Sequence, residues 1–185
     1  MKKILLIVAL LTTVLLNSCS MEATIPENGV SMDAFLQKKY LYDASVTELS
    51  KYDFDLLISR TDYYAPKGSE DFSSLYMQNM NDMSFSAFDG VDTVDLFRET
   101  DVKLVDLVIR DGLTLCIFDL CRPNKNFDYG YYYVSVDTPV YIGDPSVSLT
   151  PNGDGFSYEK KASYGNSSTF YTEKIEDHYY YYEIY

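Results

Sequence analysis

Histidine, cysteine and tryptophan are scarce in this chain of 185 residues, which contains one histidine, three cysteines and no tryptophan. A zinc site of the Cys/His type needs four such ligands at characteristic spacings. His178, Cys116 and Cys121 do not supply that pattern. The sequence therefore predicts no metal site and no cofactor.

Signatures of nucleophilic catalysis are absent as well. A nucleophile needs a general base in hydrogen-bond reach and a group that orients the base. His178 is the only histidine, and no Gly-x-Ser-x-Gly elbow accompanies it. Paired carboxylates for glycoside hydrolysis are a spatial pattern, and among 28 acidic residues the sequence singles out no pair. We therefore predict that the protein is not an enzyme.

Basic residues are few: 15 Lys and Arg stand against 28 Asp and Glu, a formal net charge of −13. Nucleic acid is disfavoured as a partner, because binding it requires a basic footprint on the protein. The acidic excess favours solubility or a basic partner.

The apolar run at the N-terminus is too short to cross a bilayer, which takes about 20 residues. It extends from Ile4 to Leu16, follows Lys2 and Lys3, and leads into small residues. This layout is typical of a secretory signal peptide.

The leader ends in Leu16-Asn17-Ser18-Cys19, which resembles the lipobox of bacterial lipoproteins. The resemblance implies cleavage before Cys19, acylation of that cysteine and attachment to a membrane of the cell envelope, facing the periplasm or the cell surface. Several acyl chains anchor a protein firmly, whereas a single chain binds only marginally. Ser20 rather than Asp follows the cysteine, which favours the outer membrane over the inner. The alternative is an ordinary signal peptide cleaved after Ser18 or Ser20.

Three segments follow: a signal peptide over residues 1–18, a lipidated tether over 19–31, and one α+β domain over 32–185. Loss of residues 1–18 removes two lysines and leaves 167 residues, with 13 basic and 28 acidic side chains and a net charge of −15. This length is sufficient for one domain with a proper core.

The first half of the domain predicts short helices. Ser31 can cap one helix, Ser45-Val46-Thr47-Glu48 has the form of a capping box, and Asp71 can cap a helix over residues 71–80. Between them, the alternation from Tyr52 to Ile58 favours a strand.

The second half predicts antiparallel strands. Val102–Ile109 and Leu113–Leu120 flank Asp111-Gly112, a strong signal for a two-residue hairpin turn. In that register Ile109 faces Thr114, Leu107 faces Cys116 and Val105 faces Phe118. Both faces of this hairpin are largely apolar, which places it centrally in the sheet. Further strands are expected over 131–136, 140–142, 156–160, 169–175 and 179–185. The predicted fold is α+β, with short N-terminal helices packed on a mainly antiparallel C-terminal sheet built from hairpins.

Cys116 and Cys121 lie on one predicted strand, where five residues span about 16 Å. That separation exceeds the reach of a disulfide, so we expect free, packed thiols. A turn at Arg122-Pro123-Asn124 that joins the two cysteines is the alternative.

Tyrosine is abundant, with 19 residues. The candidate binding surface consists of tyrosines that share faces of two predicted strands: Tyr129, Tyr131, Tyr133, Tyr179 and Tyr181. Cross-strand pairing in a core, with hydroxyls that reach water, is one hypothesis. It is the better supported, because aromatic residues favour strands. The other hypothesis is a flat aromatic platform that binds a glycan or a peptide.

Together these features predict a lipid-anchored bacterial envelope protein that acts as a non-catalytic binding module for a glycan or a protein. The alternative is an inhibitor or immunity-type partner of a basic periplasmic enzyme, for which a small acidic domain is electrostatically suited. A glycoside-acting enzyme with paired carboxylates is the third hypothesis. The sequence makes no prediction of the oligomeric state.

Overall fold

The computed structural model describes residues 28–60, 75–124, 127–161 and 167–185. The lipobox Leu16-Asn17-Ser18-Cys19 and most of the predicted tether lie outside these residues. Within the described ranges, no helix combines the length and the apolar character that crossing a membrane requires.

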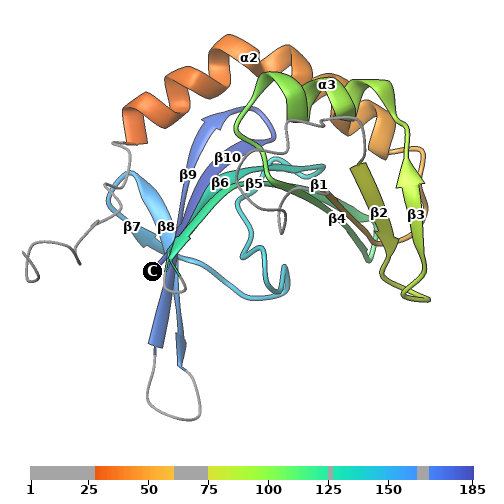
Figure 1. Cartoon of the computed structure of the whole chain (residues 1–185). Coiled ribbons are helices and arrows are strands. Elements are labelled where there is room, and N and C mark those ends of the chain that lie inside the picture. The colour runs from red at the N-terminus through yellow and green to blue at the C-terminus, as the bar shows by residue number, and fades with distance from the viewer. Residues whose placement is uncertain (1–27, 61–74, 125–126, 162–166) are drawn as a thin grey trace, which may run out of the picture.

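The described chain builds one ten-stranded antiparallel sheet and two α-helices (Figure 1). Across the sheet the strands follow the order β3-β2-β1-β4-β5-β6-β10-β9-β8-β7, so that β3 and β7 are its edges. The bounds of the strands are β1 Leu56–Arg60, β2 Leu75–Asn79, β3 Phe85–Phe88, β4 Leu104–Arg110, β5 Leu113–Asn124, β6 Phe127–Val134, β7 Thr150–Asn152, β8 Gly155–Lys161, β9 Ser167–Glu176 and β10 Tyr179–Ile184.

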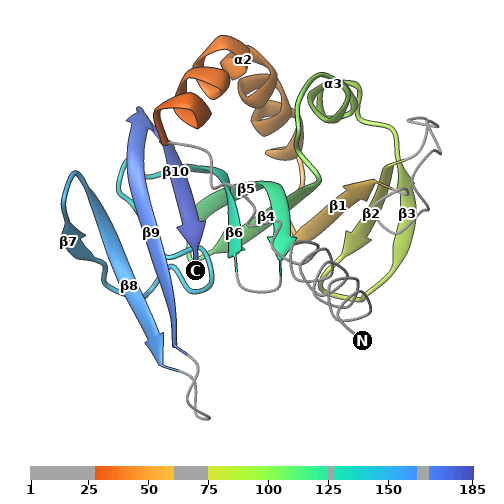
Figure 2. The same ribbon diagram turned by 60° about the vertical axis from the view of Figure 1, so that its left-hand side comes forward.

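The helices α2 (Asn28–Leu49) and α3 (Val91–Glu99) lie on the same side of the sheet (Figures 1 and 2). We call this side the helix face and the opposite side the loop face. The fold is thus a mixed α+β arrangement, as predicted, but its layout differs from the prediction. One helix is 22 residues long, the other follows β3 in mid-chain, and the sheet takes strands from both halves of the chain.

The long helix α2 corrects two expectations. It begins at Asn28, inside the predicted tether 19–31, and it continues through Ser45, where a new element was expected to start. After Pro26 the next proline is Pro66, so no residue between them lacks the backbone N–H that a continuous helix needs. Buried Phe35, Tyr42 and Leu49 recur at helical spacing and direct one side of α2 toward the sheet.

The predicted capping box at Ser45-Val46-Thr47-Glu48 joins two helices instead of starting one. The Ser45 and Thr93 hydroxyl oxygens are 2.9 Å apart. The Glu48 carboxylate accepts a hydrogen bond of 2.9 Å from the backbone N–H of Thr93, in the first turn of α3. One of the free N–H groups at the start of α3 is thus satisfied by a side chain from a distant helix.

Two further elements differ from expectation. The helix expected over residues 71–80 is contradicted where the structure describes it, because Leu75–Asn79 form β2. Leu75 is buried and Tyr76 is exposed, an alternation that a strand pairing with β1 and β3 explains. The strand expected over 140–142 does not form; these residues belong to an irregular segment over 135–149.

The central hairpin forms in the predicted register. Ile109 pairs with Thr114, Leu107 with Cys116, and Val105 with Phe118. Its strands β4 and β5 are the fourth and fifth of the ten strands, which confirms the central placement expected from apolar side chains on both faces.

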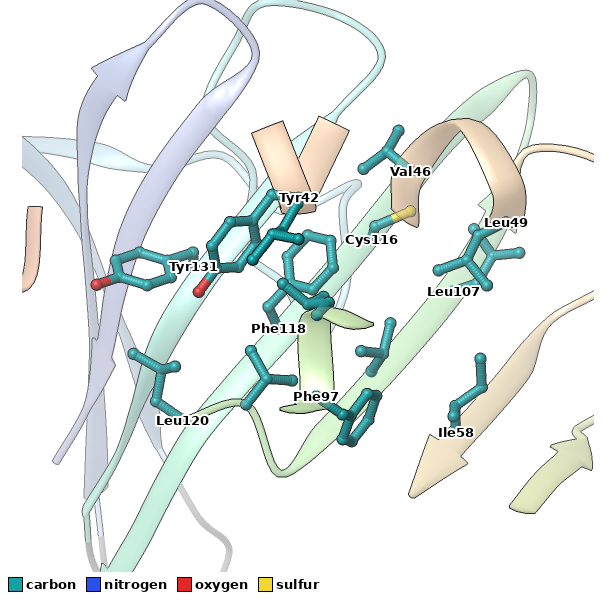
Figure 3. Packing of buried hydrophobic residues seen from close by; sticks show 14 of the residues in the cluster. Tyr42, Val46, Leu49, Ile58, Phe97, Leu107, Cys116, Phe118, Leu120 and Tyr131 are labelled. Carbon is teal, nitrogen blue, oxygen red and sulfur yellow. The ribbon is translucent and has the colours of Figure 1, made fainter. Parts of the chain in front are cut away.

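Each face of the sheet carries its own buried cluster. On the helix face, α2 and α3 cover the larger one (Figure 3), in which the Tyr42 ring meets Phe118 edge-on with centroids 5.0 Å apart. The buried residues on the loop face are Leu115, Ile117, Tyr132, Val134, Val140, Phe170, Tyr180 and Tyr182. Segment 135–149 contributes Val140 to this second cluster and packs Tyr141, Ile142 and Leu149 against it.

The cysteine prediction holds for the part that the structure describes. Strand β5 continues to Asn124, so the turn considered at Arg122-Pro123-Asn124 does not form. Cys116 is a free, buried thiol, and burial raises its pKa to about 12. This thiol packs as a small apolar side chain rather than as a nucleophile.

Candidate ligand-binding cleft

The five tyrosines predicted as a binding surface lie in the helix-face core. Tyr131, Tyr179 and Tyr181 are at most 2 % exposed, and Tyr129 and Tyr133 are partly buried against the same cluster. Three of the five rings, those of Tyr131, Tyr179 and Tyr181, are thus covered by the protein itself, which argues against a flat aromatic platform open to a ligand.

The cover over these rings is α2. The ring of Phe35 lies 4.9 Å from that of Tyr131 and 5.0 Å from that of Tyr179, centroid to centroid. The hydroxyl of Tyr179 donates a hydrogen bond of 2.9 Å to Asp43, also on α2. Strand alternation predicted which tyrosines share a face, but the long helix that covers that face was not predicted.

A cleft opens on the loop face, at the turn end of the β4–β5 hairpin. Its volume is about 730 Å³, and it is lined by Asp106, Val108, Arg110, Asp111, Leu113, Ile142, Gly143, Asp144, Pro145 and Ser146. Strands β4 and β5 with their turn form one wall, and segment 135–149 forms the other. The lining combines apolar side chains with three carboxylates and one guanidinium.

Arg110 is held at the cleft by Asp55, the residue before β1. One Asp55 carboxylate oxygen pairs with the Arg110 guanidinium, and the other accepts a hydrogen bond of 2.8 Å from the Ile109 N–H. The Asp55 side chain is 10 % exposed, whereas that of Arg110 is 58 % exposed. A guanidinium has five N–H donors in a planar fork, so Arg110 keeps donors that can face a ligand.

Asp106 stands in the middle of β4 on the loop face, paired in register with Leu57 of β1 and Ile117 of β5. Burial raises the pKa of its carboxyl to about 6, and the nearby charge of Asp55 adds to this effect while Arg110 opposes it. Among the described residues, none donates a hydrogen bond to this carboxyl. Its acceptor capacity is left for a ligand or for water.

The opposite wall is shaped by its own polar contacts. One Asp144 oxygen accepts hydrogen bonds from the backbone N–H and the hydroxyl of Ser146, at 3.0 and 2.7 Å, and these bonds lower the pKa of Asp144. A side chain at Gly143 would stand 2.7 Å from the Tyr141 ring. Glycine thus leaves room for the Tyr141 ring where the segment folds back.

His178, the one histidine considered for catalysis, lies in the β9–β10 turn. Its Nδ1 is 3.0 Å from the Val134 carbonyl oxygen, and its backbone N–H donates a hydrogen bond of 2.9 Å to Asp137. These contacts fix the turn. In the described part of the chain, no group of three or more His, Cys, Asp or Glu side chains is arranged to hold a metal ion.

None of the cleft residues was predicted as functional. The available signal was Asp106, the only charged residue among the apolar residues from Leu104 to Ile109. A charged group in a buried strand lowers the stability of the fold unless it has a partner, and it is therefore a candidate for a functional role. Asp55 and Arg110 are 55 positions apart in the sequence, so nothing local indicated that they would pair.

The arrangement can accept and donate hydrogen bonds above an apolar floor, which suits a polar ligand of moderate size. Comparison of the chain with protein-family models, with curated proteins and with solved structures finds no match.

Proposed function

We propose that this chain is a lipid-anchored protein of a bacterial cell envelope that binds a polar ligand in the cleft on the loop face, without catalysing a reaction. The observation that carries the binding role is the cleft itself, with Asp106 and Arg110 set into an apolar wall. The lipobox supports the location, with the outer membrane favoured over the inner and the domain facing the periplasm or the cell surface.

An oligosaccharide is the ligand class that fits this lining best. Sugar hydroxyls both donate and accept hydrogen bonds, and the cleft offers carboxylate acceptors at Asp106 and Asp144 beside the donors of Arg110. The apolar C–H faces of a sugar ring match the apolar floor that Val108 and Leu113 provide. This proposal keeps the glycan-binding hypothesis and moves it from the tyrosines to the cleft.

The geometry of Asp106 and its charged neighbour Asp55 favours binding over catalysis. A glycosidase needs two carboxyl groups with free access to the substrate. Asp106 has a raised pKa of about 6, which would suit a general acid. Its neighbour Asp55 is buried, however, and each of its oxygens already has a partner, one in Arg110 and the other in the N–H of Ile109. We therefore propose a binding role for Asp106 and Arg110.

The cleft is tested with a glycan array probed by the full-length chain solubilised from membranes. In Ser146→Trp an indole enters the cleft at its exposed rim, whereas Ser148→Trp places the same ring two residues away, outside the lining. Binding of the wild type and of Ser148→Trp, with at least tenfold weaker binding of Ser146→Trp, is expected. Equal binding by all three proteins would show that the glycan binds outside the cleft. Absence of binding by the wild type would contradict the glycan proposal.

The anchor is tested by metabolic labelling with a palmitate analogue in a bacterial host. The expected result is label on the wild type and on Cys121→Ser, and none on Cys19→Ser. Label that persists on Cys19→Ser contradicts the lipobox assignment. Protease treatment of intact and lysed cells then distinguishes the cell surface from the periplasm, and membrane fractionation distinguishes the outer from the inner membrane.

A further inference from the structure

The β2–β3 hairpin exposes an unusual amount of apolar surface. All residues from 80 to 87 are exposed, and four large apolar side chains stand out on the hairpin: Tyr76 at 46 %, Met80 at 41 %, Met83 at 57 % and Phe85 at 70 % exposure. Several large apolar groups exposed together on one hairpin are more typical of an interaction site than a single exposed apolar residue is. We call these four side chains the hairpin patch.

The patch is preorganised. The Asp82 carboxylate accepts hydrogen bonds from the backbone N–H and the hydroxyl of Ser84, at 2.9 and 2.6 Å. The Asn79 side chain accepts one of 2.8 Å from the Asn81 N–H. A surface whose shape is already set loses little entropy when a partner binds to it.

Strand β3 is also an open edge. Among the described residues it pairs only with β2. The bond from the Asn79 N–H to the Ser84 carbonyl, 3.0 Å long, sets the alternation of the ladder. Ser86 therefore bonds toward β2, while the backbone groups of Phe85 and Ala87 point outward.

The two edges of the sheet are built differently. Proteins protect edge strands with proline, charge or short length. The edge strand β7 has three residues and contains Pro151. The edge strand β3, Phe85-Ser86-Ala87-Phe88, has neither proline nor charge. The edge that lacks proline and charge, although it is only four residues long, is the one that carries the hairpin patch.

The charge around the hairpin indicates the partner. Residues 75–90 include two acidic residues, Asp82 in the turn and Asp89 directly after β3, and no Lys, Arg or His. A second copy of the chain would bring the same acids to the interface, on top of a net charge of −13 in each copy. A basic partner would be attracted instead.

We propose that the open edge of β3 and the hairpin patch dock an extended segment of a basic protein, which adds to the sheet as an eleventh strand. Main-chain hydrogen bonds to Phe85 and Ala87 provide the pairing, and the patch receives apolar side chains of the added strand. Lys or Arg residues of the partner meet the acids. This surface gives a location to the hypothesis of a basic envelope partner, and it is independent of ligand binding in the cleft.

The test measures fluorescence anisotropy of labelled decapeptides in which Lys or Arg alternates with Val, Tyr or Phe, added to the full-length chain in detergent. The N–H of Ala87 points outward and makes no hydrogen bond to β2. Ala87→Pro therefore removes a donor that the added strand needs and leaves the pairing of β3 with β2 intact. We expect a dissociation constant at least tenfold higher for this variant. Phe85→Lys removes the most exposed ring of the hairpin patch and places a positive charge on β3 that repels the basic peptide. We expect a similar loss of affinity for this variant.

Val136→Lys is the matched control for Phe85→Lys, because it also replaces an exposed apolar side chain with lysine, but in segment 135–149. It should leave the affinity within about twofold of the wild type. Peptides with Glu in place of Lys or Arg should not bind, and binding of the basic ones should weaken as salt is raised.

Several outcomes would overturn the proposal. These are the absence of binding by any basic peptide, equal binding by wild type and Ala87→Pro, and a Phe85-dependent dimer of the chain in analytical ultracentrifugation. Circular dichroism melting shows whether each variant folds. If one of Phe85→Lys and Ala87→Pro does not fold, the affinity of the other decides the proposal.

Discussion

The two faces of the sheet bury aromatic residues in different ways. On the helix face, rings of α2 pack on Tyr131 and Tyr179, and Tyr181 packs in turn against Tyr131. On the loop face, the irregular segment 135–149 covers Tyr132 and Tyr180, whose rings stack at 5.1 Å. A helix satisfies its own backbone hydrogen bonds, so it can cover apolar rings directly. An irregular segment cannot, and the surface beneath it must provide partners for its N–H and C=O groups.

The loop face provides those partners. The Tyr132 hydroxyl accepts a hydrogen bond of 3.3 Å from the Val140 N–H and lies 2.9 Å from the Thr172 hydroxyl. The Thr172 hydroxyl donates in turn to the Tyr181 carbonyl at 2.8 Å. Such a chain of buried polar groups holds the covering segment where helix packing is absent. The cover is also incomplete, and the cleft opens beside it.

The largest effect should come from the helix face. Phe35 is fully buried and its ring contacts those of Tyr42, Tyr131 and Tyr179. Phe35→Ala should lower the free energy of unfolding by about 3–5 kcal/mol, because it leaves a cavity among these rings. Urea denaturation measures this change. Leu36→Ala, at a neighbouring position that is 47 % exposed, should cost less than about 0.5 kcal/mol. Similar losses for both variants would contradict the burial of the helix-face core.

The second prediction concerns the charge on the loop face. The pKa of Asp106 is raised from 3.8 to about 6 in the folded state, so the folded chain binds this proton more tightly than the unfolded chain does. The contribution of this group to stability is complete below about pH 4 and is lost as the pH rises through 6. Asp106→Asn should therefore raise the free energy of unfolding by about 1–3 kcal/mol at pH 8 and leave it unchanged at pH 4.

Denaturation at both pH values checks the Asp106 prediction. Asp111→Asn is the matched control, because it makes the same charge change at an exposed turn residue of the same hairpin. Its effect should stay below about 0.5 kcal/mol at either pH. A gain for Asp106→Asn that is the same at pH 4 and pH 8 would show that the carboxyl does not titrate in this window.

The central hairpin could be predicted from the sequence because its signal is local. Asp111 and Gly112 adopt the positive φ values that such turns need, 49° and 81°, and the register of seven residue pairs follows from the turn. The faces of Tyr131 and Tyr132 followed equally from alternation along one strand.

Features that depend on distant residues could not be predicted. Glu48 looked like a local cap, but its partner Thr93 is 45 positions away. The cleft joins β4 and β5 to segment 135–149, and no sequence pattern relates these stretches. Alternation showed which side chains share a face, but not whether a helix, a loop or solvent covers that face. For this reason the five tyrosines could be grouped correctly and still be assigned to a surface that the protein buries.

The third prediction tests the polar support of the loop face. Tyr132→Phe keeps the ring and removes the hydroxyl that contacts Val140 and Thr172. The loss of buried hydrogen bonds should lower the free energy of unfolding by about 1–2 kcal/mol. Hydrogen exchange at the Val140 amide should become faster, because this N–H loses its acceptor. Tyr40→Phe on α2, where the ring is 65 % exposed, should change neither quantity.

The smallest effect should come from a polar contact between the two helices on the helix face. Where α2 meets α3, the Glu48 carboxylate accepts the Thr93 N–H and stands in for a cap that Gly90 does not supply. Glu48→Gln retains an acceptor and should cost little, whereas Glu48→Ala should lower the free energy of unfolding by about 1 kcal/mol. Hydrogen exchange in the first turn of α3 should accelerate in the alanine variant only. An equal loss in both variants would indicate that the charge of Glu48, rather than its hydrogen bond, joins the two helices.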